Sequence, residues 1–447
     1  SVNTEEKRKL YQLIAAQLRD DGFHSLVSEL EKQAQVLIPK RVEKDHLLRS
    51  VHQGGVPQQN TTHTGPLKPI SLDGLAPPPA PSQKSTLSTS NDTPLDFAES
   101  SGRAVGGNSK KRPQYETKFI TTHKNIVRCA QFSPDGLFVA TASEDSSLKV
   151  LDVEKLKDYN QMKNDPSFFE AHRPVTRTFY DHTDSIYDID FYPHADRILA
   201  SGSRDCRIHF YDVSSPNAKR GFGFIQDSHP VRSINFHPAG EYILVATAHP
   251  LIRLYNIDSK KAYVCSNSAD QHLGTINQVR YTTDGSMFAS CGKDGFLRLW
   301  DGKSNKMVKY VAHAHAGYEV SSVQFSKNGR YLLSSGKDSI VRLWDIRTGK
   351  QVKKYTGAFQ SKARVNTTFT HDEAYIISPD ESQSSVVVWN ARTGDMVERL
   401  TGHNNMVRAV ATSPTEFSLM TCSVDFRARY WFGNQKSSST TTFSVDT

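Results

Sequence analysis

The sequence has no long hydrophobic run and no closely spaced pair of cysteines. Hydrophobic residues make up only 37% of its 447 residues, and no stretch approaches the about 20 apolar residues of a membrane-spanning helix, so we expect no membrane segment. The first residues, SVNTEEKRKL, lack the apolar core of a secretory signal, which predicts a protein that stays inside the cell. None of the five cysteines lies in a C-x-x-C pair, which argues against a disulfide framework and against zinc and predicts buried, reduced thiols.

Sequence motifs of catalysis are also missing. The chain contains no phosphate-binding loop G-x-x-x-x-G-K-[ST], no H-E-x-x-H and no nucleophile elbow G-x-S-x-G. We therefore expect a protein that is not an enzyme and that has no catalytic residue, cofactor or metal. The formal charge of +8 is compatible with acidic or phosphorylated partners and with nucleic acid, but over this length it identifies none of them.

Four regions of different composition follow one another. Residues 1–53 carry helical apolar patterns, residues 54–112 are rich in Pro, Gly, Ser and Thr, residues 113–433 alternate like short strands, and residues 434–447 are polar. The second region cannot bury enough apolar surface to offset chain entropy, so we expect a disordered linker there and a flexible tail at the end. The basic residues Lys110 to Arg112 are either a weak nuclear-import signal or a solvated linker end.

The third region contains seven repeats. One equivalent position per repeat holds Leu, Tyr or Trp, at intervals of 42 to 45 residues after a first interval of 60. These positions are Leu151, Tyr211, Tyr255, Trp300, Trp344, Trp389 and Trp431. In five repeats an Asp lies six residues earlier, and a His lies 22 or 23 residues before that Asp. This pattern is typical of WD40 repeats with four strands each, and it predicts an all-β, seven-bladed propeller.

The recurring His and Asp residues have a structural interpretation. A catalytic Ser-His-Asp triad is needed once, in a cleft, whereas here the set returns in blade after blade, as expected of a hydrogen-bond network that locks each blade. Two repeats depart from the pattern. The third has His249 where Asp is expected, and the sixth lacks the early His and has Asp380 nine residues before Trp389. We expect these two blades to be the least locked.

Two further segments matter for the ring. The segment from Tyr115 to Thr121 alternates like a strand and can supply the outer strand that the last repeat lacks, which would leave no open sheet edge. After the first repeat, residues 153–178 contain a surplus of about 16 residues. We expect this surplus to form a projecting loop in which Phe168 and Phe169 are a candidate contact point.

The first region has apolar residues at helical spacing on both sides of Gly22. They are Leu10, Leu13, Ile14, Leu18, Phe23, Leu26 and Leu30. A head this small buries little surface alone, which favours homodimerisation through these residues over a self-contained three-helix bundle. The string LYQLIAAQLRDDGFHSLVSEL also resembles the lissencephaly-homology motif, a two-helix dimerisation element.

A binding surface is expected on the rim of the propeller channel. In WD40 proteins, the residue that opens each innermost strand and the residue before each turn Asp line this rim. The candidates for binding are Arg128, Tyr187, Arg204, Arg232, Lys293, Lys337 and Arg408. The other rim positions are Asn277, Ser321, Val365, Glu144, Ala248 and Val424. Six basic residues against one acidic residue form either a ring suited to carboxylates, phosphorylated peptides or nucleic acid, or ordinary solvated charge.

Several strings go beyond the general repeat pattern. They are RTFYDHTDSIYDIDFYPHADRILASGSRD, HPLIRLYNIDSKKAYV, SKNGRYLLSSGKDS and the final FRARYWF. Together with the order of head, linker and propeller, they resemble the WD-repeat subunits of cleavage stimulation factor. The resemblance implies a nuclear, non-catalytic scaffold in 3′-end cleavage and polyadenylation of messenger-RNA precursors. It also implies homodimerisation, docking on the helical-repeat scaffold subunit, association with the C-terminal tail of RNA polymerase II, and only indirect or weak RNA contact.

A second class of function shares this layout. WD-repeat substrate receptors of ubiquitin ligases, and other dimeric WD40 adaptors such as motor regulators, also combine a head with a propeller. Such receptors carry a W-D-x-R docking signature, which the string from Trp344 to Arg347 fits. This alternative stays open at the level of sequence, since the string arises often by chance in WD repeats.

Overall fold

The structure is a computed structural model that describes residues 114–159, 173–194, 197–215, 218–265 and 267–434. The expected helical head, the linker, the Phe168 and Phe169 pair and the tail from residue 435 lie outside these residues. None of the helices in the described ranges is long and apolar enough to cross a membrane.

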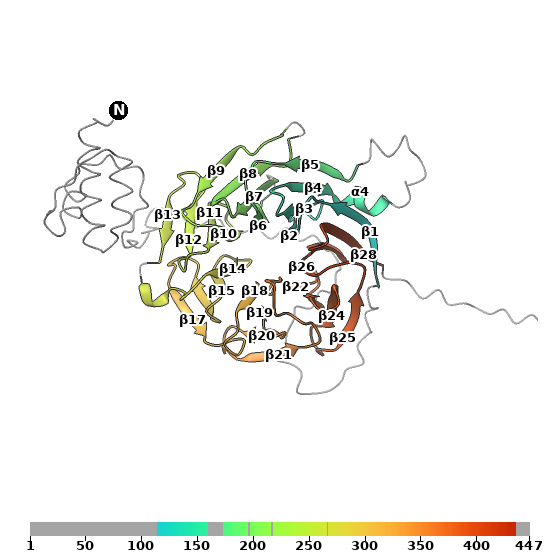
Figure 1. Ribbon diagram of the computed structural model, residues 1–447. Helices are drawn as coiled ribbons and strands as arrows, with labels where there is room; N and C mark the ends of the chain where they lie inside the picture. Colours follow the sequence, from blue (N-terminus) through green and yellow to red (C-terminus); the bar gives the residue numbers. More distant parts are fainter. Residues whose placement is uncertain (1–113, 160–172, 195–196, 216–217, 266, 435–447) are drawn as a thin grey trace, which may run out of the picture. The chain divides into compact units, whose positions relative to one another are not determined.

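The described chain forms seven four-stranded antiparallel sheets, which Figure 1 shows as the blades of a ring. Blade 1 contains β2 (Val127–Phe132), β3 (Phe138–Ser143), β4 (Leu148–Asp152) and β5 (Val175–Phe179). Blade 2 contains β6 (Ile186–Phe191), β7 (Ile198–Ser203), β8 (Arg207–Asp212) and β9 (Gly223–Gln226). Blade 3 contains β10 (Val231–Phe236), β11 (Tyr242–Thr247), β12 (Arg253–Asn256) and β13 (Ala262–Val264). The predicted seven-bladed WD40 propeller is confirmed.

The remaining blades follow the same order from the inner to the outer strand. Blade 4 contains β14 (Ile276–Tyr281), β15 (Met287–Gly292), β16 (Leu297–Asp301) and β17 (Met307–Val311), preceded by the 3-10 helix η1 (Ser268–Asp270). Blade 5 contains β18 (Val320–Phe325), β19 (Tyr331–Gly336), β20 (Val341–Asp345) and β21 (Gln351–Tyr355). Blade 6 contains β22 (Thr368–Phe369), β23 (Tyr375–Asp380), β24 (Ser385–Asn390) and β25 (Met396–Leu400). Blade 7 contains β26 (Val407–Thr412), β27 (Ser418–Ser423), β28 (Arg427–Asn434) and, from the other end of the propeller sequence, β1 (Gln114–Thr122).

Seven hydrophobic clusters make up the core, and each lies between two neighbouring blades. In the cluster between blades 3 and 4, Leu244 and Ala246 of β11 pack with Val279, Phe288 and Trp300. Because successive side chains of a strand point to opposite faces of its sheet, a blade buries one set against the preceding blade and the other set against the next. Every blade therefore depends on both neighbours for its burial.

The ring is closed by strand pairing between the two ends of the propeller sequence. β1 runs antiparallel to β28 from Gln114 opposite Asn434 to Thr122 opposite Arg427. Phe119 of β1 also packs against the cluster between blades 1 and 7. This pairing confirms the prediction that the segment from Tyr115 to Thr121 supplies the missing outer strand.

The surplus after the first repeat does not begin as a projecting loop. Val153–Asp158 form the short helix α4, which Asp152 caps by accepting from the backbone N–H groups of Glu154 at 3.0 Å and Lys155 at 3.3 Å. Val153 and Leu156 are buried in the cluster between blades 1 and 7. The expectation of a loop is wrong for these residues because an apolar pair one turn apart gives the segment a face to bury.

Blade 4 shows how the recurring His and Asp lock a blade. Nδ1 of His272 lies 2.9 Å from Oδ2 of Asp294, and its Nε2 lies 2.7 Å from Oγ of Ser290. The same Ser290 oxygen accepts from the indole Nε1 of Trp300 at 2.8 Å. Equivalent His, Asp and Ser or Thr contacts recur in blades 2, 5 and 7. In blade 1 the His123 Nδ1 to Asp145 Oδ2 distance is longer, at 3.6 Å.

Blades 3 and 6 hold different polar networks at the same place. In blade 3, Asp227 is buried and accepts from the hydroxyl of Tyr255 at 2.8 Å, with Nη1 of Arg253 at 3.2 Å. In blade 6, Nε2 of the fully buried Gln360 donates to Oγ of Ser378 at 2.6 Å. The contacts do not support the expectation that these blades are the least locked, because other side chains replace the missing His.

The cysteines are free thiols. Cys129, Cys265, Cys291 and Cys422 are buried as expected, whereas Cys206 is half-exposed in the turn between β7 and β8.

Removing β1 should open the ring. A chain that begins at residue 123 lacks Gln114–Thr122, so the edge of β28 and the apolar contacts of Phe119 are exposed to water. We expect this chain to melt at a lower temperature and to aggregate, in contrast to a chain that begins at residue 113. Calorimetry with light scattering measures both properties. Equal melting temperatures would contradict closure by β1.

The histidines of the propeller predict that stability falls in mild acid. Burial lowers the pKa of the imidazoles of seven residues, namely His123, His209, His237, His249, His272, His315 and His403. Their contribution is complete above the unfolded His pKa of about 6.5 and is lost as the pH falls through that value, because the unfolded chain then binds more protons. Burial also raises the pKa of three carboxyl groups, those of Asp190, Glu373 and Glu398, which act in the opposite direction but are outnumbered. We expect a lower melting temperature at pH 5.5 than at pH 7.5.

A substitution taken from blade 6 tests whether a lock histidine causes this dependence on pH. Gln360 fills the His position of blade 6 with a side chain that does not titrate, so His403→Gln should flatten the dependence of melting temperature on pH. An unchanged dependence in this variant would show that His403 does not contribute.

Candidate partner-binding site at the upper mouth of the channel

The innermost strands of the seven blades lie around the central axis of the ring (Figure 1). They are β2, β6, β10, β14, β18, β22 and β26, and we call the region along this axis the channel. We call the end at which these strands begin the upper mouth and the end at which they finish the lower mouth. The start of six of these strands shares one irregularity. In each, the strand pairing shifts register by one residue around the second position, as between Val127 and Cys129 in β2. Such a bulge leaves an extra residue out of the ladder and redirects its side chain.

The predicted rim residues Arg128, Tyr187, Arg232 and Arg408 occupy this bulged second position. The guanidinium carbons of Arg128 and Arg232 lie 4.9 and 5.9 Å from the ring centre of Tyr187. Distances of this size allow a cation–π attraction on the ring face. The bulges thus bring together residues that are some 45 to 60 positions apart in the sequence.

Arg364 of blade 6 reaches across the upper mouth to three other blades. Its Nη1 donates to the carbonyl oxygens of Arg232 at 3.0 Å and Asn277 at 2.5 Å, and its Nη2 donates to that of Tyr187 at 3.3 Å. All three carbonyl groups belong to bulged residues, whose backbone groups the strand ladder leaves without a regular partner. One side chain therefore compensates for the bulges of blades 2, 3 and 4.

The upper mouth contains more positive than negative charge. Glu144 forms an ion pair with Arg128, and Oε2 of Glu319 lies 2.7 Å from Nζ of Lys337. Another carboxylate, that of Glu381, accepts from three backbone N–H groups of residues 361–363. Within the described ranges, Arg232, Arg364 and Arg408 have no carboxylate at ion-pair distance. These three guanidinium groups are the uncompensated charges of the mouth.

The arginines also perturb one another. Burial and the neighbouring charge of Arg232 lower the pKa of Arg364 to about 10. Burial lowers the pKa of Arg232, and burial together with the charge of Arg128 lowers that of Arg408. All three remain protonated at neutral pH. Such shifts mean that each of these charges is held first against the cost of burial and then against the repulsion of a neighbouring arginine.

The other predicted rim residues, Arg204, Lys293 and Lys337, follow β7, β15 and β19 and are not bulged residues. Arg204 is largely exposed, with its Nε 3.7 Å from Oδ2 of Asp184, and Lys293 is exposed. Lys337 is the ion-pair partner of Glu319. The prediction for the sixth blade is wrong, because Val365 is 1% exposed and the channel residue is Arg364.

Arg364 could have been found from the spacing. In blade 5, Phe325 lies five positions after Val320, the first buried apolar residue of the strand, whereas Phe369 lies six positions after Ala363. The additional residue moves Arg364 into the position that Arg408 occupies in blade 7.

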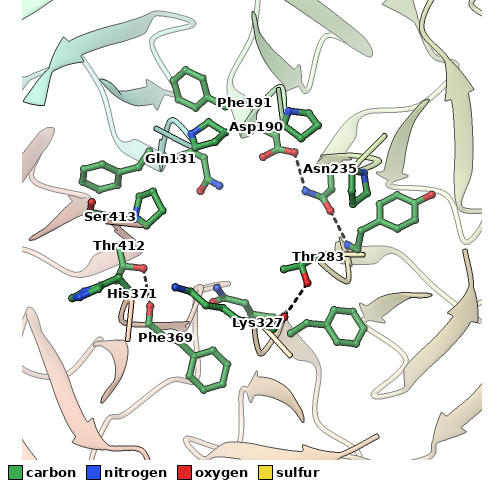
Figure 2. Close-up of a pocket in the computed structure, with 18 of the residues that line it drawn as sticks. Gln131, Asp190, Phe191, Asn235, Thr283, Lys327, Phe369, His371, Thr412 and Ser413 are labelled. Carbon is green, nitrogen blue, oxygen red and sulfur yellow. Dashed lines mark hydrogen bonds between the residues drawn. The ribbon is translucent and has the colours of Figure 1, made fainter. Parts of the chain in front are cut away.

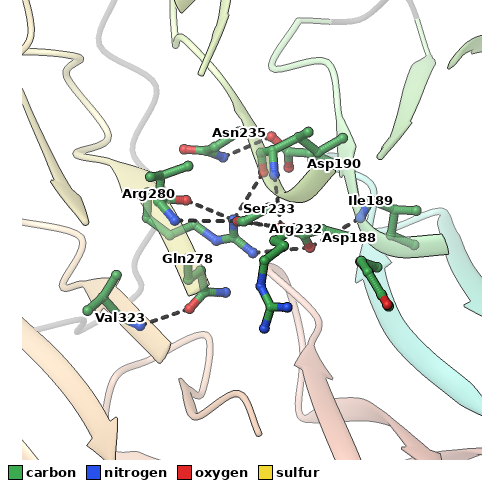
Figure 3. A network of polar contacts seen from close by, with 12 residues as sticks. Asp188, Ile189, Asp190, Arg232, Ser233, Asn235, Gln278, Arg280 and Val323 are labelled. Atoms are coloured by element: carbon green, nitrogen blue, oxygen red, sulfur yellow. Dashed lines mark hydrogen bonds and ion pairs between the residues drawn. The ribbon is translucent and has the colours of Figure 1, made fainter. Parts of the chain in front are cut away.

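The wall of the channel holds a compensated group of charges (Figure 3). Asp188 accepts from Oγ of Ser233 at 2.6 Å, from the backbone N–H of Ile234 at 3.1 Å and from Nη1 of Arg280 at 3.1 Å. Although burial opposes it, the carboxylates of Asp188 and Asp190 raise the pKa of Arg280. Arg280 thus differs from the arginines of the upper mouth, since two carboxylates face it.

The lower mouth contains a cavity of about 420 Å³ lined by the ends of the innermost strands (Figure 2). Nδ2 of Asn235 donates to Oδ2 of Asp190 at 2.8 Å, and Oδ1 of Asn235 accepts from the backbone N–H of Tyr281 at 2.7 Å. Burial raises the pKa of Asp190 to about 6. Lys327 and Glu373 add one charge of each sign to the lining. This mixture does not select a ligand of one charge, so the upper mouth is the stronger candidate site.

The W-D-x-R string is largely used inside its blade. Trp344 is buried and donates from Nε1 to Oγ of Ser334 at 2.8 Å, and Asp345 is buried and accepts from the backbone N–H of Thr348 at 3.0 Å. The exposed residue of the string is Arg347.

Comparison with known proteins adds two kinds of similarity. Five segments match the WD domain, G-beta repeat family, at residues 114–152, 173–212, 263–301, 306–345 and 394–431. Over 426 residues the chain is 38% identical to cleavage stimulation factor subunit 50 of Arabidopsis thaliana, an alignment that covers 95% of each protein. It is 28% identical over 138 residues to Coronin-7 of Rattus norvegicus, covering 30% of this chain and 15% of that protein. It is also 25% identical over 206 residues to nuclear distribution protein PAC1 of Arthroderma benhamiae, covering 44% and 40%.

The five matched segments end in blades 1, 2, 4, 5 and 7. The two unmatched blades are those in which Asp227 and Gln360 replace the His. The segments that match the repeat family are therefore those whose blades contain the His and Asp lock.

The role of Arg364 can be tested by unfolding. Arg364→Ala leaves three carbonyl groups without their donor, and a buried polar group without a partner costs about 1–3 kcal/mol. We expect the free energy of unfolding in urea, followed by tryptophan fluorescence, to fall by about 2 kcal/mol or more. Arg408→Ala is the matched control, because that guanidinium has no hydrogen-bond partner among the described residues. Equal losses in the two variants would refute the bridging role.

Proposed function

The chain belongs to the family of cleavage stimulation factor subunit 50, and from this membership we propose that it is a non-catalytic scaffold subunit of the cleavage stimulation complex. It would act in the nucleus, in 3′-end cleavage and polyadenylation of messenger-RNA precursors. The observation that carries the proposal is the extent of the similarity, since 95% of each protein is aligned and the alignment is not confined to the repeats. The shorter alignments with Coronin-7 and PAC1 support no more than shared WD repeats.

The proposed scaffold has two interaction regions. Residues 1–53 form a homodimer through the seven apolar residues from Leu10 to Leu30 given above, and the propeller docks the helical-repeat scaffold subunit of the same complex. The C-terminal tail of RNA polymerase II is a further proposed partner, and RNA contact is indirect or weak. A ring whose blades each depend on both neighbours supports this role, because it holds surface residues of different blades at fixed positions.

Affinity purification from nuclear extract tests the proposal. The intact chain and a chain of residues 113–447 are purified, their partners are identified by mass spectrometry, and the mass of each chain is measured by light scattering. We expect the other cleavage-stimulation subunits with both chains, and a dimeric mass for the intact chain alone. The shorter chain is the control that separates docking from dimerisation.

Each result that contradicts these expectations refutes a different part of the proposal. Recovery of cullin-adaptor subunits in place of cleavage-stimulation subunits would favour a ubiquitin-ligase receptor and refute the scaffold role. A dimeric mass for residues 113–447 would refute only the assignment of dimerisation to the head.

A further inference from the structure

The arginines of the upper mouth have donors that no group of the described chain accepts. The Nε atoms of Arg128, Arg232 and Arg408 are buried and lack a hydrogen-bond partner among the described residues. Buried donors in folded proteins are nearly always paired, so unpaired ones call for an explanation. Three of them within one charged group indicate an acceptor that the chain itself does not provide.

The pattern of charge indicates how large the negative ligand is. Arg232, Arg364 and Arg408 lack carboxylate partners, yet Glu144, Glu319 and Glu381 stand at the same mouth. A nucleic-acid backbone carries a charge at every nucleotide, so some of its phosphates would come close to these carboxylates and be repelled. A single anionic group seated between the arginines would meet positive charge alone.

Four exposed apolar side chains lie in loops at the same end of the propeller as the mouth. Leu273 is 81% exposed, Tyr318 57%, Phe359 47% and Phe426 44%. Leu273, Tyr318 and Phe359 lie in the loops that lead into β14, β18 and β22, and Phe426 lies in the turn before β28. All four therefore belong to the end of the propeller that carries the arginines. Exposed apolar groups around a charged centre are typical of a surface that binds protein.

We propose that the upper mouth binds an acidic segment of a partner protein, with one carboxylate between Arg232 and Arg408 against Tyr187 and with apolar side chains on the surrounding loops. The guanidinium fork matches a carboxylate in geometry and in charge. This inference rests on the proposed scaffold function and gives the chemistry of one of its partners.

A peptide selection tests the proposal. The full chain is used to select from a displayed library of random 12-residue peptides, and binding of the selected peptides is measured by fluorescence anisotropy. We expect selected peptides to share Asp or Glu beside apolar residues. The double substitution Arg232→Gln with Arg408→Gln should weaken their binding by about tenfold or more, since a charge-assisted hydrogen bond contributes about 1.5–3 kcal/mol.

The control variant makes the same change of charge elsewhere. Arg347 and Lys350 are exposed in the turn between β20 and β21, beside Arg330 of the β18 to β19 turn, whose carbonyl accepts from the backbone N–H of Ile346. Since β18 ends at the lower mouth, this turn lies at the opposite end of the channel. Arg347→Gln with Lys350→Gln should bind the selected peptides like the unaltered chain.

If the double variant loses binding, a stability measurement distinguishes the loss of peptide contacts from damage to the fold. Because the arginines repel one another in the free chain, Arg408→Gln should raise its melting temperature slightly, and a selected peptide should raise that of the unaltered chain. A lower melting temperature for Arg408→Gln would mean that the arginine serves the fold, which would overturn the proposal.

Other results also overturn it. These are selected peptides without acidic residues, equal binding by both double variants, stronger binding when phosphoserine replaces the acidic residue, and displacement of the peptide by a uridine-rich RNA of 12 nucleotides. The outcome is independent of the purification from nuclear extract. Recovery of the complex without acidic-peptide binding would leave the scaffold function and remove this inference alone.

Discussion

The whole propeller depends on the closure of a ring. Its core consists of seven clusters, and each of them needs two neighbouring blades. A blade taken alone would expose an apolar face on either side, so no subset of blades retains the burial of the complete circle. The pairing of β1 with β28 completes the seventh sheet from both ends of the propeller sequence. This one pairing completes the seventh blade and thereby closes the ring of seven interdependent sheets.

Within the closed ring, the polar locks tolerate substitution as long as the hydrogen-bond geometry remains. Gln360 takes the place of a His by donating to Ser378, 18 residues later, as His272 lies opposite Ser290 at the same spacing. Asp227 places a carboxylate at this position, and Arg253 forms an ion pair with it. The requirement at this position is a buried polar group with partners, and several residue types satisfy it.

The architecture could be predicted from the sequence because it consists of seven similar repeats. Period, blade number and the closing strand all follow from spacing that recurs seven times, so a local irregularity does not change the result. The channel mouth does not repeat in this way. Arg364 was missed because one extra residue between Ala363 and Phe369 shifts the register of a single blade. Leu156 was missed because helix α4 occurs once, after blade 1. Single features of this kind are decided by packing, which spacing alone does not reveal.

Apart from Arg364, the uncompensated arginines of the upper mouth are not explained by the needs of the fold. The bulges that open the innermost strands leave carbonyl groups toward the channel, and one guanidinium, that of Arg364, is enough to satisfy those of blades 2, 3 and 4. Arg408 adds a further positive charge without a hydrogen-bond partner in the described part of the chain, and burial together with the charge of Arg128 disfavours it. The wall below shows the alternative, since Arg280 is matched there by Asp188 and Asp190. A chain that compensates one buried arginine so fully, and leaves others uncompensated a short distance away, has at its upper mouth a charge that is matched only when a negative group of another molecule is present.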